Sequence, residues 1–211
     1  MDDITLEGVQ QDCNFNIKHI LNNESNCLYS NSNHTCKSYD FDTFKEKTEK
    51  LTDSMSILSL NIRSLPKKWS HFEDFVSNVN STKFKHSVIG LSEIWNIPFN
   101  LNFKLPGYKP LVYKIRDSLG VNNNAGGGVG LFVDDNFEFE VLENISIFIP
   151  HVIETIFIKL KTGKNKFQII GNIYRPNTLP HGNVKIFNEY LNLTLEKIKM
   201  TLYLSKLRAF L

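Results

Sequence analysis

The sequence predicts a mixed α/β fold in which helices lie outside packed β-sheets. Short apolar runs, of the length of buried strands, recur from residue 56 onward. Two other segments repeat their apolar residues at helical spacing, one after the first run and one near residue 190. The order is therefore strand, helix, strand, then several strands in antiparallel order and a final helix. This order is typical of a sandwich with mixed α/β layers.

The first strand and the first long helix are predicted between residues 56 and 79. Ser56–Arg63 (SILSLNIR) is short and apolar, as a buried strand is. Ser64 is expected to cap the helix that follows, with Pro66 in its first turn. The helix is expected to pack against the sheet through one apolar face. That face consists of Trp69, Phe72, Phe75, Val76 and Val79.

The middle of the chain contains five further apolar runs that are each expected to form a strand. Pro106-Gly107 marks a turn, and Asn122–Gly127 is expected to be a flexible loop. The five runs are His86–Glu93, Tyr108–Ile115, Gly128–Val133, Phe137–Leu142 and Ile145–Ile149.

A hairpin and a long helix are predicted in the last third. Thr155–Leu160 and Phe167–Tyr174 flank Lys161–Asn165 (KTGKN), a turn in which Gly163 is expected to take a positive φ. A helix is expected at about Val184–Met200. One side of it carries Phe187, Leu191, Thr194 and Ile198.

The composition favours a folded protein with a small net charge. The hydrophobic fraction is 41% and there are 16 Phe, which indicates a packed core. The net charge of +2 lacks the basic excess typical of many nucleic-acid-binding proteins. We expect an intracellular protein, in nucleus or cytoplasm, with no secretory signal and no membrane partner. Cys13, Cys27 and Cys36 fit neither a zinc pattern nor a disulfide framework and are expected to be free thiols.

Residues 1–53 are predicted to form a weakly ordered polar leader. Seven Asn fall between Asn14 and Asn33, and the charges alternate over Lys45–Lys50 (KEKTEK). One short helix is expected near Thr43–Leu51. The folded domain is expected to span residues 54–211.

Polar residues at the carboxyl ends of apolar strands are the candidate site residues. Asn61, Glu93 and Tyr174 each end a strand, and Arg175 and Asn177 follow. Such groups tend to gather at one rim of a sheet, where ligand sites are commonly found. Mg²⁺ takes hard oxygen ligands, often from only one or two carboxylates, with water and substrate phosphate completing its shell. Glu93 fits a metal ligand, and Asn61 fits a group that orients a ligand or a phosphate oxygen. Tyr174 and Asn177 can donate hydrogen bonds to phosphate oxygens.

Each of these residues also has a plain structural interpretation. A Glu at a strand end is often solvated, an Asn before a turn is a turn former, and Tyr-Arg-Pro-Asn is an ordinary strand exit. The run Gly126–Gly130 (GGGVG) is not a phosphate-binding P-loop, because no Lys-Ser/Thr follows it and the next element is a strand. The isolated histidines at 71, 86, 151 and 181 show no ligand spacing.

Five segments in a fixed order carry a resemblance to a known family. They are SLNIRSL at Ser59–Leu65, IGLSEIW at Ile89–Trp95, PGYKPLVYKIRD at Pro106–Asp117 followed by GGGVGLFV at Gly126–Val133, ETIFIKL at Glu154–Leu160, and IIGNIYRPN at Ile169–Asn177. Over about Ser56–Met200 the chain resembles the apurinic-like endonuclease domain of non-LTR (LINE-type) retrotransposons. That domain belongs to the endonuclease/exonuclease/phosphatase superfamily. Ile94 departs from the family, which usually has Glu-Thr-Trp there.

The resemblance implies a four-layered αββα sandwich and the Mg²⁺-dependent hydrolysis of a DNA phosphodiester, with Mn²⁺ as an alternative ion. By this resemblance Glu93 is a direct metal ligand, Asn61 belongs to the metal and phosphate site, and Tyr174 contacts the scissile phosphate. Asn177 would bind phosphate, and Arg175 would face the DNA or the solvent. The implied partners are DNA and the reverse transcriptase portion of the parent element.

Two motifs of that family do not occur in the 211 residues. One is Gly-Asp-x-Asn, whose Asp and Asn position and activate the water. The other is Ser-Asp-His, whose His works at the reacting phosphate; Asp134, Asp135 and His181 have different surroundings and do not replace them. We therefore expect a partial sandwich, truncated at the C-terminus, with an inner sheet face left uncovered and with incomplete catalysis. The alternative is a non-enzymatic retroelement remnant that at most binds nucleic acid or a protein partner through an exposed sheet edge. No oligomeric state is predicted.

Overall fold

The computed structural model describes residues 41–48, 55–81, 84–98, 101–116, 126–176 and 183–208. The chain divides into two units, Met1–Lys47 and Thr48–Leu211. The described part of the first unit is helix α2 (Phe41–Thr48), which reaches one residue into the second. Asp42 in its first turn and lysines in its last turn suit the helix dipole. The remainder of the predicted leader lies outside the described residues.

The first sheet of the second unit is mixed, with strand order β1-β2-β4-β3. Strand β1 (Ile57–Asn61) runs parallel to β2 (Val88–Ser92), and helix α3 (Leu65–Asn80) connects the two. Strand β4 (Val129–Val133) is antiparallel to both β2 and β3 (Val112–Lys114). The long connection through α3 is what a parallel pair requires.

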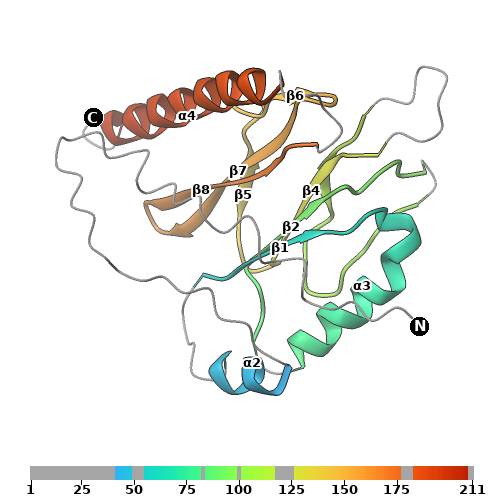
Figure 1. The fold of residues 1–211 in the computed structure, drawn as a ribbon. Helices are drawn as coiled ribbons and strands as arrows, with labels where there is room; N and C mark the ends of the chain where they lie inside the picture. The colour runs from blue at the N-terminus through green and yellow to red at the C-terminus, as the bar shows by residue number, and fades with distance from the viewer. Residues whose placement is uncertain are drawn as a thin grey trace. The chain divides into compact units, whose positions relative to one another are not determined.

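The second sheet is antiparallel and is built around β7 (Ile153–Gly163). Strand β8 (Lys166–Tyr174) pairs with one edge of β7. The short strands β5 (Phe139–Val141) and β6 (Phe148–Ile149) share the other edge. Over the described residues the chain is thus a mixed α/β protein with two four-stranded sheets, which confirms the predicted class (Figure 1).

Two apolar clusters hold these layers together. Helix α3 packs on one face of the mixed sheet, where Phe72 and Val76 lie with Ile89, Leu91 and Phe132. The opposite face of the mixed sheet packs against the antiparallel sheet. The members of this second cluster are Val88, Val129, Leu131, Val133, Ile156, Ile158, Leu160 and Ile170.

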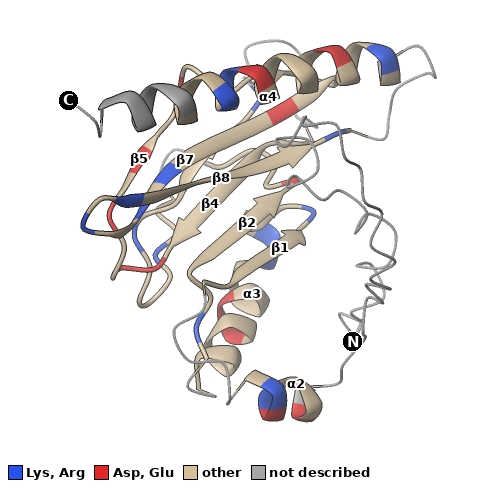
Figure 2. Ribbon diagram, turned by 90° about the vertical axis from the view of Figure 1, so that its left-hand side faces the viewer, with Lys and Arg blue, Asp and Glu red and all other residues tan. Residues whose placement is uncertain are grey.

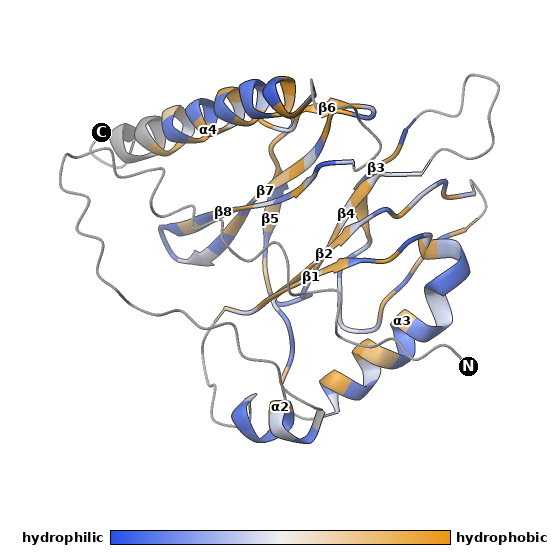
Figure 3. Ribbon diagram, viewed as in Figure 1, coloured by the Kyte–Doolittle hydropathy of each residue, from blue (hydrophilic) through white to orange (hydrophobic). Residues whose placement is uncertain are grey.

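The expectation of an uncovered inner face is therefore wrong for these strands, because the chain supplies both facing sheets. Successive residues of β2, Val88 and Ile89, point into opposite clusters, as the strand repeat of two requires. Figure 3 shows the resulting concentration of hydrophobic residues along β2 and β4.

Helix α4 (Asn183–Arg208) packs on the antiparallel sheet and contacts β7. Its buried residues follow helical spacing at Leu191, Thr194, Leu195 and Ile198. The inner face of this sheet is already filled by the second cluster, so α4 covers the outer face. The helix extends beyond the predicted end at Met200. Among the described residues, no helix is both long enough and apolar enough to cross a membrane.

Three local predictions were wrong for identifiable reasons. Ser64 does precede α3, but its φ is 88° and its hydroxyl makes no capping bond. Gly163 does not take a positive φ, because it ends β7 and the turn is formed by Lys164 and Asn165. The strand predicted at 108–115 shrinks to β3, since Pro110 interrupts the ladder and Tyr108 forms only an isolated bridge with Asp134.

Candidate functional site

The exits of β1 and β2 run side by side at one rim of the mixed sheet. The parallel register pairs Asn61 with Ser92, so both strands end at the same level. Three backbone hydrogen bonds continue the pairing beyond the strands. They run from Ile62 N to Ser92 O (3.0 Å), from Ser64 N to Glu93 O (2.8 Å) and from Leu65 N to Ile94 O (3.0 Å).

This rim has an unusual backbone. Arg63, Ser64, Glu93 and Trp95 all have positive φ, at 46°, 88°, 54° and 61°. Residues other than glycine rarely adopt such angles, and they do so where the surrounding structure holds them. The two strand exits at this rim are therefore turns with an uncommon backbone conformation.

Asn61, Glu93 and Tyr174 come together at this rim. Glu93 Oε1 accepts a hydrogen bond from Asn61 Nδ2 (2.9 Å) and another from the Tyr174 hydroxyl (2.7 Å). Asn61 Oδ1 in turn accepts the backbone N–H of Arg63 (3.3 Å). Because Tyr174 ends β8, the cluster joins the two sheets. Three of the five candidate residues thus lie within direct contact.

The Tyr174 phenol is held in its protonated form. Burial raises its pKa, and the hydrogen bond to Glu93 and the charge of that carboxylate raise it further. The negative charge of Glu154 adds to this effect, while Arg116 opposes it. At neutral pH Tyr174 is therefore a hydrogen-bond donor beside a carboxylate.

The other two candidates do not join the cluster among the described residues. Arg175 is exposed, and its guanidinium lies 5.9 Å from the centre of the Phe187 ring on α4. This is a cation–π contact, which directs Arg175 toward the helix. Asn177 lies outside the described residues.

Asn172 is a buried polar residue near the rim that the sequence did not predict to have a role. It is buried on the inner face of β8, and its Nδ2 donates to Leu91 O (2.8 Å) and to Gly130 O (3.3 Å). One amide thus connects β8 with β2 and β4, two residues from Tyr174. The available signal was a polar residue inside the apolar run FQIIGNIY.

The fully buried carboxylate of Glu154 was missed as well. It accepts hydrogen bonds from Arg116 Nε (2.5 Å) and from the backbone N–H of Gly128 (2.5 Å). Arg116 is also linked to His151 Nδ1 (3.2 Å). A Glu between Ile153 and Thr155 at the start of an apolar strand was the available signal, because such a charge must find a partner.

The described residues contain no group of three or more His, Cys, Asp or Glu side chains that could hold a metal ion. Within those residues Glu93 is the carboxylate of the rim cluster. Any cation bound there would therefore depend on one carboxylate, with amide or phenol oxygens and water beside it.

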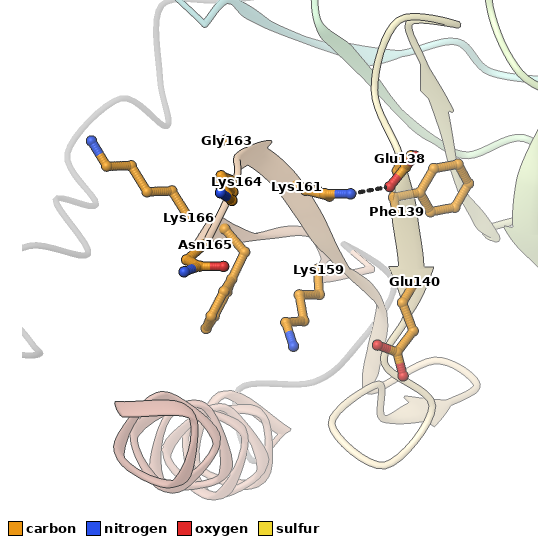
Figure 4. A pocket seen from close by; sticks show the side chains of 10 residues that line it. Glu138, Phe139, Glu140, Lys159, Lys161, Gly163, Lys164, Asn165 and Lys166 are labelled. Carbon is orange, nitrogen blue, oxygen red and sulfur yellow. Dashed lines mark hydrogen bonds and ion pairs between the residues drawn. The ribbon is translucent and has the colours of Figure 1, made fainter. Parts of the chain in front are cut away.

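A shallow hollow lies at the other end of β7 and β8, around their hairpin (Figure 4). Four lysines line it with Phe167, and Lys161 pairs with Glu138 (2.6 Å). Figure 2 shows this basic hairpin near the acidic residues of the β5 segment. Because Tyr174 is at the opposite end of β8, this hollow is separate from the rim.

The sequence was compared with models of known protein families and with curated proteins, and neither comparison found a match.

Proposed function

We propose that this chain carries the metal- and phosphate-binding half of an endonuclease/exonuclease/phosphatase site. The parent activity would be the Mg²⁺-dependent hydrolysis of DNA phosphodiesters, as in the endonuclease domain of a retrotransposon-derived protein. The observation that carries the proposal is the convergence of Asn61, Glu93 and Tyr174 at one rim. Asn61 and Tyr174 lie 32 and 81 residues from Glu93 in the chain.

The layer order supports the same assignment. Helix α3, the mixed sheet, the antiparallel sheet and α4 follow one another through the two apolar clusters and the α4 contact with β7. We interpret this order as part of a four-layered αββα sandwich, with the cluster at the end where β1, β2 and β8 finish. Ligand sites in α/β proteins commonly lie beyond the carboxyl ends of strands.

The donor set at the rim fits a magnesium ion. Mg²⁺ commonly binds through one or two carboxylates and keeps several waters, with substrate phosphate completing its shell. Glu93 Oε1 accepts both hydrogen bonds of the cluster, and the other carboxylate oxygen accepts none from the described residues. Glu93 would hold the ion through that second oxygen. When bound, Mg²⁺ would polarise a phosphoryl oxygen of the substrate.

Asn61 and Tyr174 would act through orientation. Both donate to the same oxygen of Glu93, which fixes the rotation of the carboxylate. Because the pKa of Tyr174 is raised, its phenol remains protonated and can donate to a carboxylate or to a phosphate oxygen. Arg175 follows Tyr174 in the chain and is exposed, but its guanidinium lies against Phe187, so it would reach a DNA backbone only by leaving that ring.

Neither Gly-Asp-x-Asn nor Ser-Asp-His occurs in the sequence. These 211 residues therefore lack the family's groups that position and activate the water and the histidine that works at the reacting phosphate. We therefore propose that this chain binds a divalent cation and phosphate but does not complete hydrolysis.

A second candidate is a non-enzymatic protein that binds a partner strand. Within the described residues β8 pairs only with β7, and β1 pairs only with β2. Ile57 on β1 is 50% exposed, so an apolar residue stands at one of these free edges. Free strand edges favour strand addition by another polypeptide.

The test is Mn²⁺ binding followed by electron paramagnetic resonance, together with a plasmid-nicking assay with and without Mg²⁺. Wild type, Glu93→Gln and the control Glu140→Gln would be compared, since Glu140 is an exposed carboxylate of β5 remote from the rim. We expect Mn²⁺ binding by wild type and the control, loss of binding in Glu93→Gln, and no nicking. Absence of Mn²⁺ binding by folded wild-type protein would refute the proposal. Nicking that Glu93→Gln abolishes would refute the claim of incomplete catalysis.

A further inference from the structure

Glu154 is fully buried beneath a glycine turn at residues 126–128 that borders the rim. One carboxylate oxygen faces the Arg116 guanidinium, and the other accepts the backbone N–H of Gly128. A buried carboxylate is tolerated only when charge and hydrogen bonds compensate its lost hydration. Glu154 meets this condition on both oxygens, so its position is closely specified.

The glycine turn is itself hydrogen-bonded to the residues that follow β2. Gly128 O accepts the N–H of Ile94 (3.4 Å), and Gly127 O accepts the N–H of Trp95 (2.8 Å). Gly127 and Gly128 have φ of 89° and 84°, which glycine adopts at little cost. A Cβ on Gly127 would collide with the Arg116 guanidinium, so Arg116 packs directly against this turn.

Glu93 lies immediately before the two anchored residues. Its φ of 54° is unfavourable for a side chain of this type, and its own carbonyl accepts the N–H of Ser64 (2.8 Å). The hydrogen bonds from the N–H groups of Ile94 and Trp95 to the glycine turn hold the backbone on the C-terminal side of Glu93. The direction of the Glu93 carboxylate therefore depends on where the glycine turn sits.

We propose that Glu154, held by Arg116, is a positioning residue that fixes the Glu93 carboxylate through the glycine turn. Glu154 is also the ladder partner of Tyr174 on β8, so it is linked to the rim cluster both through this pairing and through the glycine turn. An effect of Glu154 on metal affinity rests on the proposed function of Glu93, whereas its effect on the backbone of residues 94 and 95 depends only on the hydrogen bonds.

The experiment compares Glu154→Gln with Asp134→Asn in the full chain. Asp134 is a suitable control because it is likewise a buried carboxylate with a cationic partner, Lys85 at 2.9 Å, and it has no contact with the glycine turn. Three quantities are measured: the Mn²⁺ affinity by paramagnetic resonance, the amide hydrogen exchange of Ile94 and Trp95, and the free energy of unfolding. A purely structural role would lower stability without changing the first two.

We expect Glu154→Gln to lower the Mn²⁺ affinity on the order of 10-fold, as the loss of outer-shell partners commonly does. The amides of Ile94 and Trp95 should exchange faster in this variant. Asp134→Asn should leave both quantities at their wild-type values even where stability falls. If Glu154→Gln does not fold, Arg116→Lys provides the second variant, with the same expected direction.

Two results separate the inference from the function on which it partly rests. Unchanged exchange at Ile94 and Trp95 and unchanged Mn²⁺ affinity in folded Glu154→Gln would overturn the inference and leave the proposed function intact. Wild-type protein that binds no Mn²⁺ would overturn the proposed function. In that case faster exchange in Glu154→Gln would still support the positioning of the β2 exit, and unchanged exchange would refute it.

Discussion

The hydroxyl of Tyr174 donates a hydrogen bond to Glu93 Oε1 across 2.7 Å, although the two residues are 81 positions apart in the chain. Tyr174 ends a strand of the antiparallel sheet, and Glu93 follows a strand of the mixed sheet. The bond therefore forms only when the two sheets are correctly packed, and it reports on the assembly of the rim.

Replacing Glu93 by Gln should lower the pKa of Tyr174. Burial, the first cause of its raised pKa, persists in the variant, but the charge of the carboxylate is removed. The pKa should therefore fall without reaching its usual value. An NMR titration of tyrosines labelled at the hydroxyl-bearing carbon measures this directly, with Tyr174→Phe for assignment and Glu140→Gln as the control. An unchanged pKa would mean that the bond is absent in solution.

Asn172→Ala should destabilise the fold by about 1–3 kcal/mol, because the substitution removes a buried amide that bonds two carbonyls of the facing sheet. Gln168→Ala is the matched control, since Gln168 is an exposed amide on the same strand and is expected to change stability by less than ~0.5 kcal/mol. Urea unfolding of wild type and of the two variants measures both changes in the free energy of unfolding. Equal effects of the two substitutions would contradict the cross-sheet role of Asn172.

Gly171→Ala should also destabilise the protein, by about 1–3 kcal/mol, because a Cβ there would collide with the ring of its ladder partner Phe157. At Gly163 the nearest atom to an added Cβ is 3.5 Å away and the backbone is not left-handed. Gly163→Ala should therefore be nearly neutral. Thermal unfolding of the two variants tests the difference, and equal melting temperatures would show that the Phe157 ring moves aside freely.

The fold should lose stability in mild acid because of His86. Burial lowers its pKa from 6.5 to about 4, and its Nδ1 lies 2.7 Å from the Ser56 hydroxyl. A lowered pKa means that the folded state prefers the neutral ring, so this contribution is present above pH 6.5 and is lost as the pH falls toward 4. The loss is on the order of 2 kcal/mol.

Unfolding free energies measured from pH 7 to pH 4 would show this loss in wild type and a smaller one in His86→Gln. Other groups also titrate over this range, so the difference between the two proteins is the quantity to compare. Parallel curves would rule out His86 as the source.

The layered arrangement could be predicted from the sequence because its strands are short apolar runs and α3 keeps its buried residues on one face. The same logic led to Asn61, Glu93 and Tyr174, since each polar residue ends such a run. Boundaries near Tyr108 and Gly163 were less accurate, because a proline and the exact length of a hairpin decide them.

Glu154 and Asn172 could not be assigned a role from the sequence, for a physical reason. Each is a polar residue inside an apolar strand, and what it does depends on a partner that is 38 or 81 residues away. Local patterns contain no information on such pairings. Ser64 was misjudged similarly: its sequence position suits a cap, but its backbone N–H pairs with Glu93 O, its φ is 88° and its hydroxyl makes no capping bond.

The left-handed backbone of Arg63, Ser64, Glu93 and Trp95 has a consequence for how this protein could be engineered or could drift. Each such residue costs stability on the order of 1 kcal/mol, which a glycine at the same position would recover in part. Arg63→Gly is thus a route to a more heat-resistant protein whose cluster remains intact, whereas Glu93→Gly would relieve the same strain only by deleting the carboxylate that accepts from Asn61 and Tyr174. The rim is therefore where thermal tolerance and the proposed cation binding would oppose each other, and a lineage without a need for that binding would be free to accumulate glycines there.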